Sequence, residues 1–170
     1  MNTRGFTLIE TLVYLGLYAI LMTGALVAMY SLFESSNRNL VKAMVQEEGS
    51  FLTGKIDWVL TGVQTINLPV VPPSPTSGPT LSVTKYDTSI GNPIVIGLSG
   101  HDLTISKAGG PATALNNSNV SLGNLVFTHT AASGDGINPE SLSASFTLFS
   151  TTSDGLPFSQ NFSTIKYLRK

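Results

Sequence analysis

Residues 4–33 read RGFTLIETLVYLGLYAILMTGALVAMYSLF, and this stretch decides the organisation of the chain. From Thr11 to Phe33, 23 residues follow one another without a charged side chain. A helix rises about 1.5 Å per residue, so this run covers roughly 35 Å, enough to cross the hydrocarbon core of a bilayer. We therefore predict a membrane-spanning helix. One carboxylate, that of Glu10, lies at its front edge, where placing a charge in lipid is costly.

This stretch differs from a cleaved secretory signal. Such a signal has an apolar region of about 7–15 residues, followed by a small-residue cleavage site. Here the apolar run is longer, and the residues after it, ESSNRNLVKAMVQEE at 34–48, read as more helix. The basic residue ahead of the run is Arg4. By the positive-inside tendency, we expect residues 1–5 in the cytoplasm and the bulk of the chain outside.

The composition excludes several classes of protein. Of 170 residues, 42% are apolar and 11% are charged, against about 25% charged in a typical soluble domain. The formal net charge of −1 gives no bias toward nucleic acid, which we do not expect as a partner. The chain contains no cysteine, so it forms neither a disulfide framework nor a thiolate metal site.

The helical pattern continues beyond the apolar run. At 100° per residue, one face of the next segment is apolar. Its members are Val41, Val45, Leu52, Ile56, Val59 and Val63. No proline occurs before Pro69, so we predict one helix from about Phe6 to about Ile66. Glu48 and Lys55 fall inside the apolar arc; we expect them to extend outward to solvent, and the alternative is pairing with neighbouring helices in a bundle.

The remaining sequence predicts a connector and a β domain. Residues 68–79, LPVVPPSPTSGP, are rich in proline and read as an extended linker. Residues 80–170 contain short alternating segments between turn residues, for example SLSASFTLFS at 141–150. We predict one small antiparallel sheet, covered by the outer half of the long helix. The expected fold class is α+β, with an N-terminal helix that is membrane-spanning over 6–33 and amphipathic over 34–67.

The opening residues resemble a known processing signal. Arg4 and the hexapeptide GFTLIE at 5–10, followed by an uninterrupted apolar run, are similar to the start of type IV pilins and of type II secretion pseudopilins. The resemblance implies that residues 1–5 are a leader, that a prepilin peptidase cleaves between Gly5 and Phe6, and that the new amino group of Phe6 is methylated. It also implies that the helix holds the chain in the inner membrane, with the C-terminal domain extracytoplasmic, before entry into a pilus or pseudopilus.

The same resemblance implies a role for Glu10 in assembly. Its carboxylate would neutralise the amino group of Phe6 on a neighbouring subunit, or on its own, and so set the axial register of a filament. Loss of one partner of a buried ion pair leaves an unpaired charge, which suits a device for register. The alternative is that Glu10 marks the membrane interface. The implied partners are prepilin peptidase, other pilin-type subunits in a homo- or heteropolymer, an inner-membrane assembly platform and membrane lipid.

The chain departs from many major pilins in two respects. Its membrane span has no helix-kinking proline, although Gly16 and Gly24 could loosen the helix, and a cysteine-closed loop near the C terminus is impossible. We therefore expect a minor subunit. Secretion, motility, adhesion and DNA uptake remain open as roles, so a DNA-uptake or adhesion minor pilin is one alternative. Another is an extracytoplasmic binding protein or enzyme that uses a pilin-like anchor.

No other motif points to catalysis. His101 and His129 are the two histidines, and neither has the spacing of a metal or catalytic pair. In SGDGINPES, the side chains of Asp135, Asn138 and Glu140 offer oxygen ligands for calcium. The segment lacks the ligand density of a calcium loop, so a plain turn is the preferred interpretation. We therefore expect no enzyme activity, no cofactor and no metal.

Overall fold

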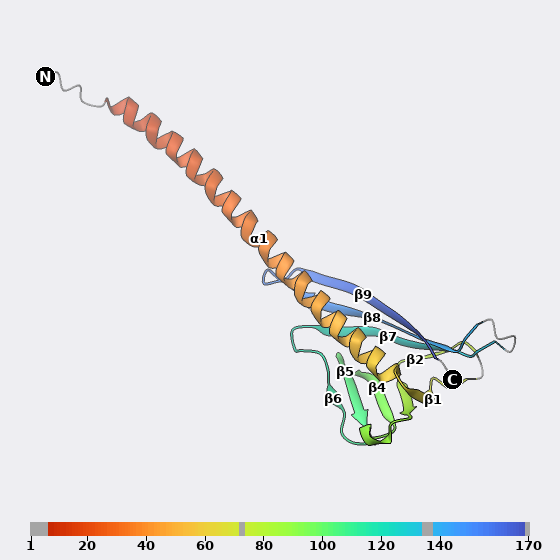
Figure 1. Ribbon diagram of the computed structural model, residues 1–170. Helices are drawn as coiled ribbons and strands as arrows, with labels where there is room; N and C mark the ends of the chain where they lie inside the picture. The colour runs from red at the N-terminus through yellow and green to blue at the C-terminus, as the bar shows by residue number, and fades with distance from the viewer. Residues whose placement is uncertain (1–6, 72–73, 134–137, 169–170) are drawn as a thin grey trace. The chain divides into compact units, whose positions relative to one another are not determined.

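The computed structural model describes residues 7–71, 74–133 and 138–168. The chain divides into two compact units, Met1–Leu40 and Val41–Lys170. One helix, α1 (Leu8–Leu60), passes through both, and the strands all belong to the second (Figure 1). The predicted α+β class, a long N-terminal helix followed by antiparallel sheet, is confirmed.

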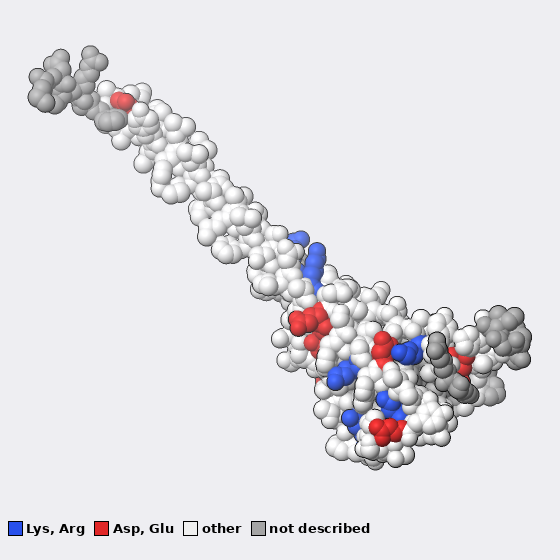
Figure 2. Space-filling model, viewed as in Figure 1, with Lys and Arg blue, Asp and Glu red and all other residues white. Residues whose placement is uncertain are grey.

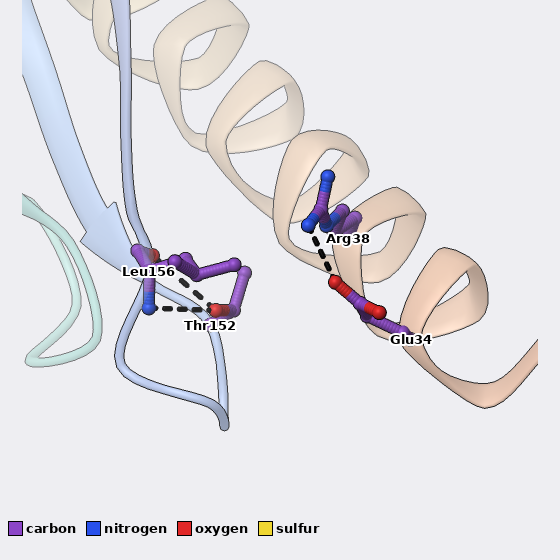
Figure 3. Close-up of polar contacts among 4 residues, drawn as sticks. All are labelled: Glu34, Arg38, Thr152 and Leu156. Carbon is purple, nitrogen blue, oxygen red and sulfur yellow. Dashed lines mark hydrogen bonds and ion pairs between the residues drawn. The ribbon is translucent and has the colours of Figure 1, made fainter. Parts of the chain in front are cut away.

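The first unit is built from the N-terminal part of α1. All side chains from Thr7 to Phe33 are exposed, and those from Thr11 onward are uncharged, so this part of the helix is white in Figure 2. Among the described residues, α1 is the one helix long and apolar enough to cross a membrane, with a window of mean hydropathy 2.1 that is not buried at all. Past the apolar run, Arg38 pairs with Glu34 one turn earlier (Figure 3).

The helix ends earlier than predicted. It stops at Leu60, not near Ile66, and strand β1 (Val63–Leu68) follows. Gly62 has a φ of 71°, the left-handed conformation that commonly terminates helices. The β-branched residues after it favour a strand once the helix has been broken.

A lysine from β3 (Leu81–Lys85) donates a hydrogen bond to a carbonyl oxygen in the last turn of α1. Buried Lys85 donates from Nζ to the carbonyl oxygen of Trp58 at 2.8 Å, and this nitrogen lies 4.2 Å from the indole centre. The last turn of α1 has no basic residue of its own, and a cation here is favoured by the helix dipole. Burial lowers the pKa of Lys85; Asp87 opposes this shift and Lys107 adds to it.

Two antiparallel sheets stand where one was predicted. The five-stranded sheet has the order β1-β3-β4-β5-β6, and the four-stranded sheet has the order β2-β7-β8-β9 (Figure 1). Their further bounds are β2 Thr76–Gly78, β3 Leu81–Lys85, β4 Ile94–Ser99, β5 Asp102–Lys107, β6 Thr113–Ala114, β7 Ser121–Thr130, β8 Ser141–Thr151 and β9 Pro157–Tyr167. A short 3-10 helix, Thr88–Ile90, links β3 to β4.

The predicted boundaries at 34–67, 68–79 and 80–170 need correction for the same reason. β1 overlaps the end of the predicted helix and the first residue of the predicted linker, and β2 lies within that linker, where it pairs with β7. A strand of three residues is too short to show alternation, and proline on both sides hides it further. The sheet region therefore starts at Val63 and includes part of the proline-rich segment.

One hydrophobic core joins the second part of α1 to both sheets. Its buried members include Val45, Leu52, Ile56 and Val59 from α1, Leu81, Val83, Ile94 and Ile96 from the five-stranded sheet, and Phe127, Leu142, Phe146 and Leu148 from the four-stranded sheet. The prediction that the apolar face of the helix covers β structure is confirmed. The helix must approach closely, because a Cβ atom on Gly49 would overlap the ring of Phe162 in β9.

Candidate functional site

The candidate site is the start of α1, where Thr7 caps the helix. The carbonyl oxygen of Thr7 accepts from the backbone N–H groups of Glu10 at 3.1 Å and Thr11 at 3.2 Å. Its Oγ1 lies 3.4 Å from the nitrogen of Glu10. This is the T-x-x-E spacing of a capping box, which places Glu10 at the third helical position. Sequence reasoning missed this arrangement, although the T-x-x-E spacing signals it.

Glu10 combines exposure with a favourable local field. The aligned peptide dipoles make the helix N-terminus positive, so a carboxylate in the first turn is stabilised there. Within the described ranges 7–71, 74–133 and 138–168, no basic side chain forms an ion pair with Glu10. The carboxylate therefore stands at the front of the uncharged run 11–33, without an ion pair to any described residue.

The processing residues themselves lie outside the described part of the chain. Gly5 and Phe6 precede Thr7, where the description begins. Cleavage between them and methylation of Phe6 remain predictions from the resemblance.

The surface behind Glu10 cannot be buried by the first unit alone. Leu8 is 84% exposed and Leu15 is 70% exposed, and the pattern continues to Phe33. A Cβ atom added to Gly16 or Gly24 would meet no atom within 4 Å, and the helix continues through both glycines. So large an exposed apolar surface calls for lipid or other protein around it.

Of the three calcium candidates, Asn138 and Glu140 make contacts within the protein. Glu140 Oε1 lies 2.9 Å from His129 Nε2, and the backbone N–H of Asn138 donates to Ser133 Oγ at 2.9 Å. Asp135 is outside the described residues. Across the described part of the chain, no three His, Cys, Asp or Glu side chains gather as a metal site.

His129 is buried and held at both ring nitrogens. Its Nδ1 lies 2.8 Å from the carbonyl oxygen of Pro69, opposite the contact with Glu140. A cavity of about 440 Å³ borders this pair, but the ring has no free nitrogen for chemistry in it. Alternation with Leu125 and Phe127 was the signal that places His129 inside. His101 lies in the β4–β5 turn, exposed.

The two charges inside the apolar arc also find local partners. Both carboxylate oxygens of Glu48 accept from Asn117, one from its backbone N–H and one from its side-chain amide, each at 2.9 Å. Lys55 Nζ lies 5.2 Å from the ring centre of Phe51 on the same helix. Glu48 thus binds the loop before β7 through Asn117. The prediction that its side chain extends to solvent is wrong.

Comparison with known proteins bears on the N-terminal site. Residues 1–26 match a family model described as the prokaryotic N-terminal methylation motif. The predicted resemblance at the start of the chain to the N-terminal motif of type IV pilins and pseudopilins is thereby confirmed. No curated protein and no solved structure matches the chain.

Proposed function

We propose that this chain is a structural subunit of a type IV pilus or of a type II secretion pseudopilus. The observation that carries the proposal is an exposed, uncharged helix surface that begins at Glu10, which forms no ion pair with any described residue and lies within a prepilin methylation motif. Such a motif implies processing by prepilin peptidase and assembly with other pilin-type subunits. The cut falls between Gly5 and Phe6, and the amino group of Phe6 is then methylated.

Processing supplies a positive charge that can pair with the carboxylate of Glu10. The new amine of Phe6 is positive, and an ion pair at 4 Å is worth roughly 4 kcal/mol at an effective dielectric constant near 20. In a packed bundle of apolar helices, a shift that separates the two charges leaves both unpaired and buried. The pair therefore selects one axial register, either between neighbouring subunits or within one.

The role is structural, not catalytic. Before assembly the helix over 6–33 anchors the chain in the inner membrane, with the second unit extracytoplasmic; assembly then proceeds on an inner-membrane platform. The unkinked span, which contains no proline, favours a minor subunit over a major one.

Replacing Glu10 tests the proposal. Glu10→Gln keeps the size and polarity of the side chain and removes its charge. We expect its incorporation into sheared filaments to fall at least about tenfold, because the amine of Phe6 would be left buried without a counter-charge. Glu34→Gln is the matched control, because Glu34 lies on the same helix beyond the apolar run and pairs locally with Arg38. Equal incorporation of Glu10→Gln and Glu34→Gln would overturn the role of Glu10.

A further inference from the structure

His129 is a buried titratable side chain that the proposed function does not use. It lies in β7 with 5% of its surface exposed, and the side chain of Glu140, which contacts it, is 15% exposed. Nδ1 lies 2.8 Å from the carbonyl oxygen of Pro69, and Nε2 lies 2.9 Å from Oε1 of Glu140. Each ring nitrogen therefore faces an oxygen atom at hydrogen-bond distance.

These two oxygen atoms set the number of protons at the site. A backbone carbonyl oxygen only accepts a hydrogen bond, so Nδ1 must donate to Pro69. An ionised carboxylate also only accepts, so Nε2 must donate to Glu140 as well. A neutral imidazole has one N–H, and the two contacts need two. If the carboxyl group is protonated instead, it donates to Nε2 and the count is the same. The pair therefore holds one proton more than a neutral histidine beside an ionised glutamate.

The contacts of the ring connect three segments of the chain. Pro69 directly follows β1 of the five-stranded sheet, His129 lies in β7 of the four-stranded sheet, and Glu140 directly precedes β8. Val70 and Val71, which follow Pro69, line the cavity of about 440 Å³ that also borders His129 and Glu140. The ring thus fastens the chain that leaves one sheet to a strand of the other sheet.

The surroundings of the pair contain few charged groups. Apart from the pair, the side chains that line the cavity are not titratable. On the adjoining elements, Lys166 of β9 lies one strand beyond the β8 partner of His129, and Lys85 of β3 donates to the end of α1. On α1, Asp57 accepts a hydrogen bond from Thr164. These three charges are the same in the wild type and in variants of the pair, so a comparison between them cancels their titration.

We propose that His129 and Glu140 form a proton-dependent clasp, which fastens Pro69 to β7 while the pair holds the extra proton and releases it when this proton is lost. A hydrogen bond to a carboxylate is stronger than one to a neutral carbonyl oxygen. The N–H that remains is therefore the one on Nε2, toward Glu140, and Nδ1 then turns a lone pair toward the oxygen of Pro69. Two acceptors at this distance repel each other, so residues 69–71 move away from β7 and the cavity opens.

The proton count gives the direction of the pH dependence. In an unfolded chain, histidine binds its second proton near pH 6.5 and glutamate binds its proton near pH 4.3. Above about pH 6.5 the unfolded chain holds fewer protons than the clasped state, so the contribution of the clasp to stability falls as the pH rises. Between about pH 4.3 and 6.5 the two counts are equal and the clasp contributes fully. Its contribution is lost again below about pH 4.3. The clasp is independent of the N-terminal helix, so it stands whether or not the chain enters a filament.

Denaturant titration of the full chain in detergent micelles, between about pH 6.5 and 8.5, tests the proton count. The fluorescence of Trp58, the one tryptophan, reports unfolding. In Glu140→Gln, the side-chain N–H donates to Nε2 of a neutral ring, so both contacts form without the extra proton. Over this range, we expect the unfolding equilibrium constant of the wild type to rise at least about fivefold more than that of Glu140→Gln. The matched control is Glu47→Gln, at an exposed position of α1, which should keep the rise of the wild type.

Nitrogen-15 NMR of the full chain, labelled in its histidine rings and backbone, tests the release of Pro69. In the wild type, we expect the ring of His129 to change its protonation between about pH 6 and 8.5. The amide of Val70 belongs to the same peptide group as the carbonyl of Pro69, so its chemical shift should change over the same range. In Glu140→Gln, the shift of the Val70 amide should stay constant above about pH 6.5. His101, exposed in the β4–β5 turn, serves as the reference ring.

Three results would overturn the proposal. The first is an equal rise of the unfolding constant in the wild type and Glu140→Gln. The second is a His129 ring with the same protonation at about pH 6 and 8.5 in the folded wild type. The third is a Val70 amide that stays fixed while the ring changes, since the pair would then titrate without releasing Pro69. The last two measurements need only the wild type, so they decide the question even if Glu140→Gln does not fold.

Discussion

At the residue scale, Glu10 has one role that the structure shows, at the start of a helix, and one that we propose, in assembly. In the single chain it occupies the third position of a helix capped by Thr7. The same position leaves its carboxylate exposed, without an ion pair in the described part of the chain. Local helix formation therefore presents the charge that the proposed assembly would use, and the two roles can be tested separately.

Removing the cap should affect helix formation alone. Thr7→Val deletes the oxygen that faces the N–H of Glu10, so the first turn should lose about 1 kcal/mol of stability. Hydrogen exchange of the Glu10 and Thr11 amides measures this loss. Thr23→Val is the control, because Thr23 Oγ1 bonds to the carbonyl oxygen of Ala19 inside the helix. Equal exchange in Thr7→Val and the wild type would contradict the capping role.

His129 should contribute to stability in a way that His101 does not. His129→Ala removes the ring that contacts the carbonyl oxygen of Pro69 and Oε1 of Glu140 in a buried site. We expect the free energy of unfolding to fall by about 1–3 kcal/mol. His101→Ala, at an exposed turn, should change it by less than about 0.5 kcal/mol. Denaturant titration of both variants measures the difference, and similar values for the two would refute the packing argument.

At the element scale, the second part of α1 distinguishes two glycines only a few residues apart. Gly49 faces Phe162 of β9, whereas an added Cβ atom on Gly54 would meet no atom within 4 Å. Gly49→Ala should lower the free energy of unfolding by roughly 1–3 kcal/mol through overpacking. Gly54→Ala should raise it by about 0.5–1 kcal/mol, because alanine favours helix. Thermal unfolding of the two variants should shift in opposite directions; a shift in the same direction would contradict the close approach of α1 to β9.

The short 3-10 helix should give a pH-dependent contribution. Asp87 Oδ1 accepts from the side chain and the backbone of Ser89, and these bonds lower the pKa of Asp87 below its ordinary 3.8. A lowered folded-state pKa stabilises the fold above the unfolded-state pKa, and this contribution is lost as the pH falls through the folded value. The stability difference between the wild type and Asp87→Ala should therefore hold at pH 7 and shrink below about pH 3.8. A difference that grows in acid would contradict this.

At the scale of the whole molecule, much of the plan was predictable. An uncharged run of 23 residues and an apolar stripe from Val41 to Val59 both appear in α1. The end of the helix was missed because Val63 and Ile66 continue the helical stripe, and the break depends on the backbone of Gly62. Periodicity reports which face is buried; it does not report where a positive φ interrupts it.

The pairing of strands could not be predicted in the same way. Alternation in SLSASFTLFS identifies an inward face, but it leaves open which strand lies beside it, so two sheets were taken for one. The contact between His129 and Glu140 depends on the pairing of β7 with β8, which brings His129 beside the residues that lead into β8. The methylation motif around Glu10 could be recognised from sequence because its elements are local: a helix start, an apolar run and a charge at a fixed position.

The mass of the mature chain, purified from a host with an active prepilin peptidase, tests the central claim most directly. The account predicts that intact-mass and N-terminal peptide measurements find a chain that begins at N-methylated Phe6, with residues 1–5 removed. A chain that retains Met1 through Gly5 in that host would contradict processing as a pilin-type subunit, and with it the role assigned to Glu10.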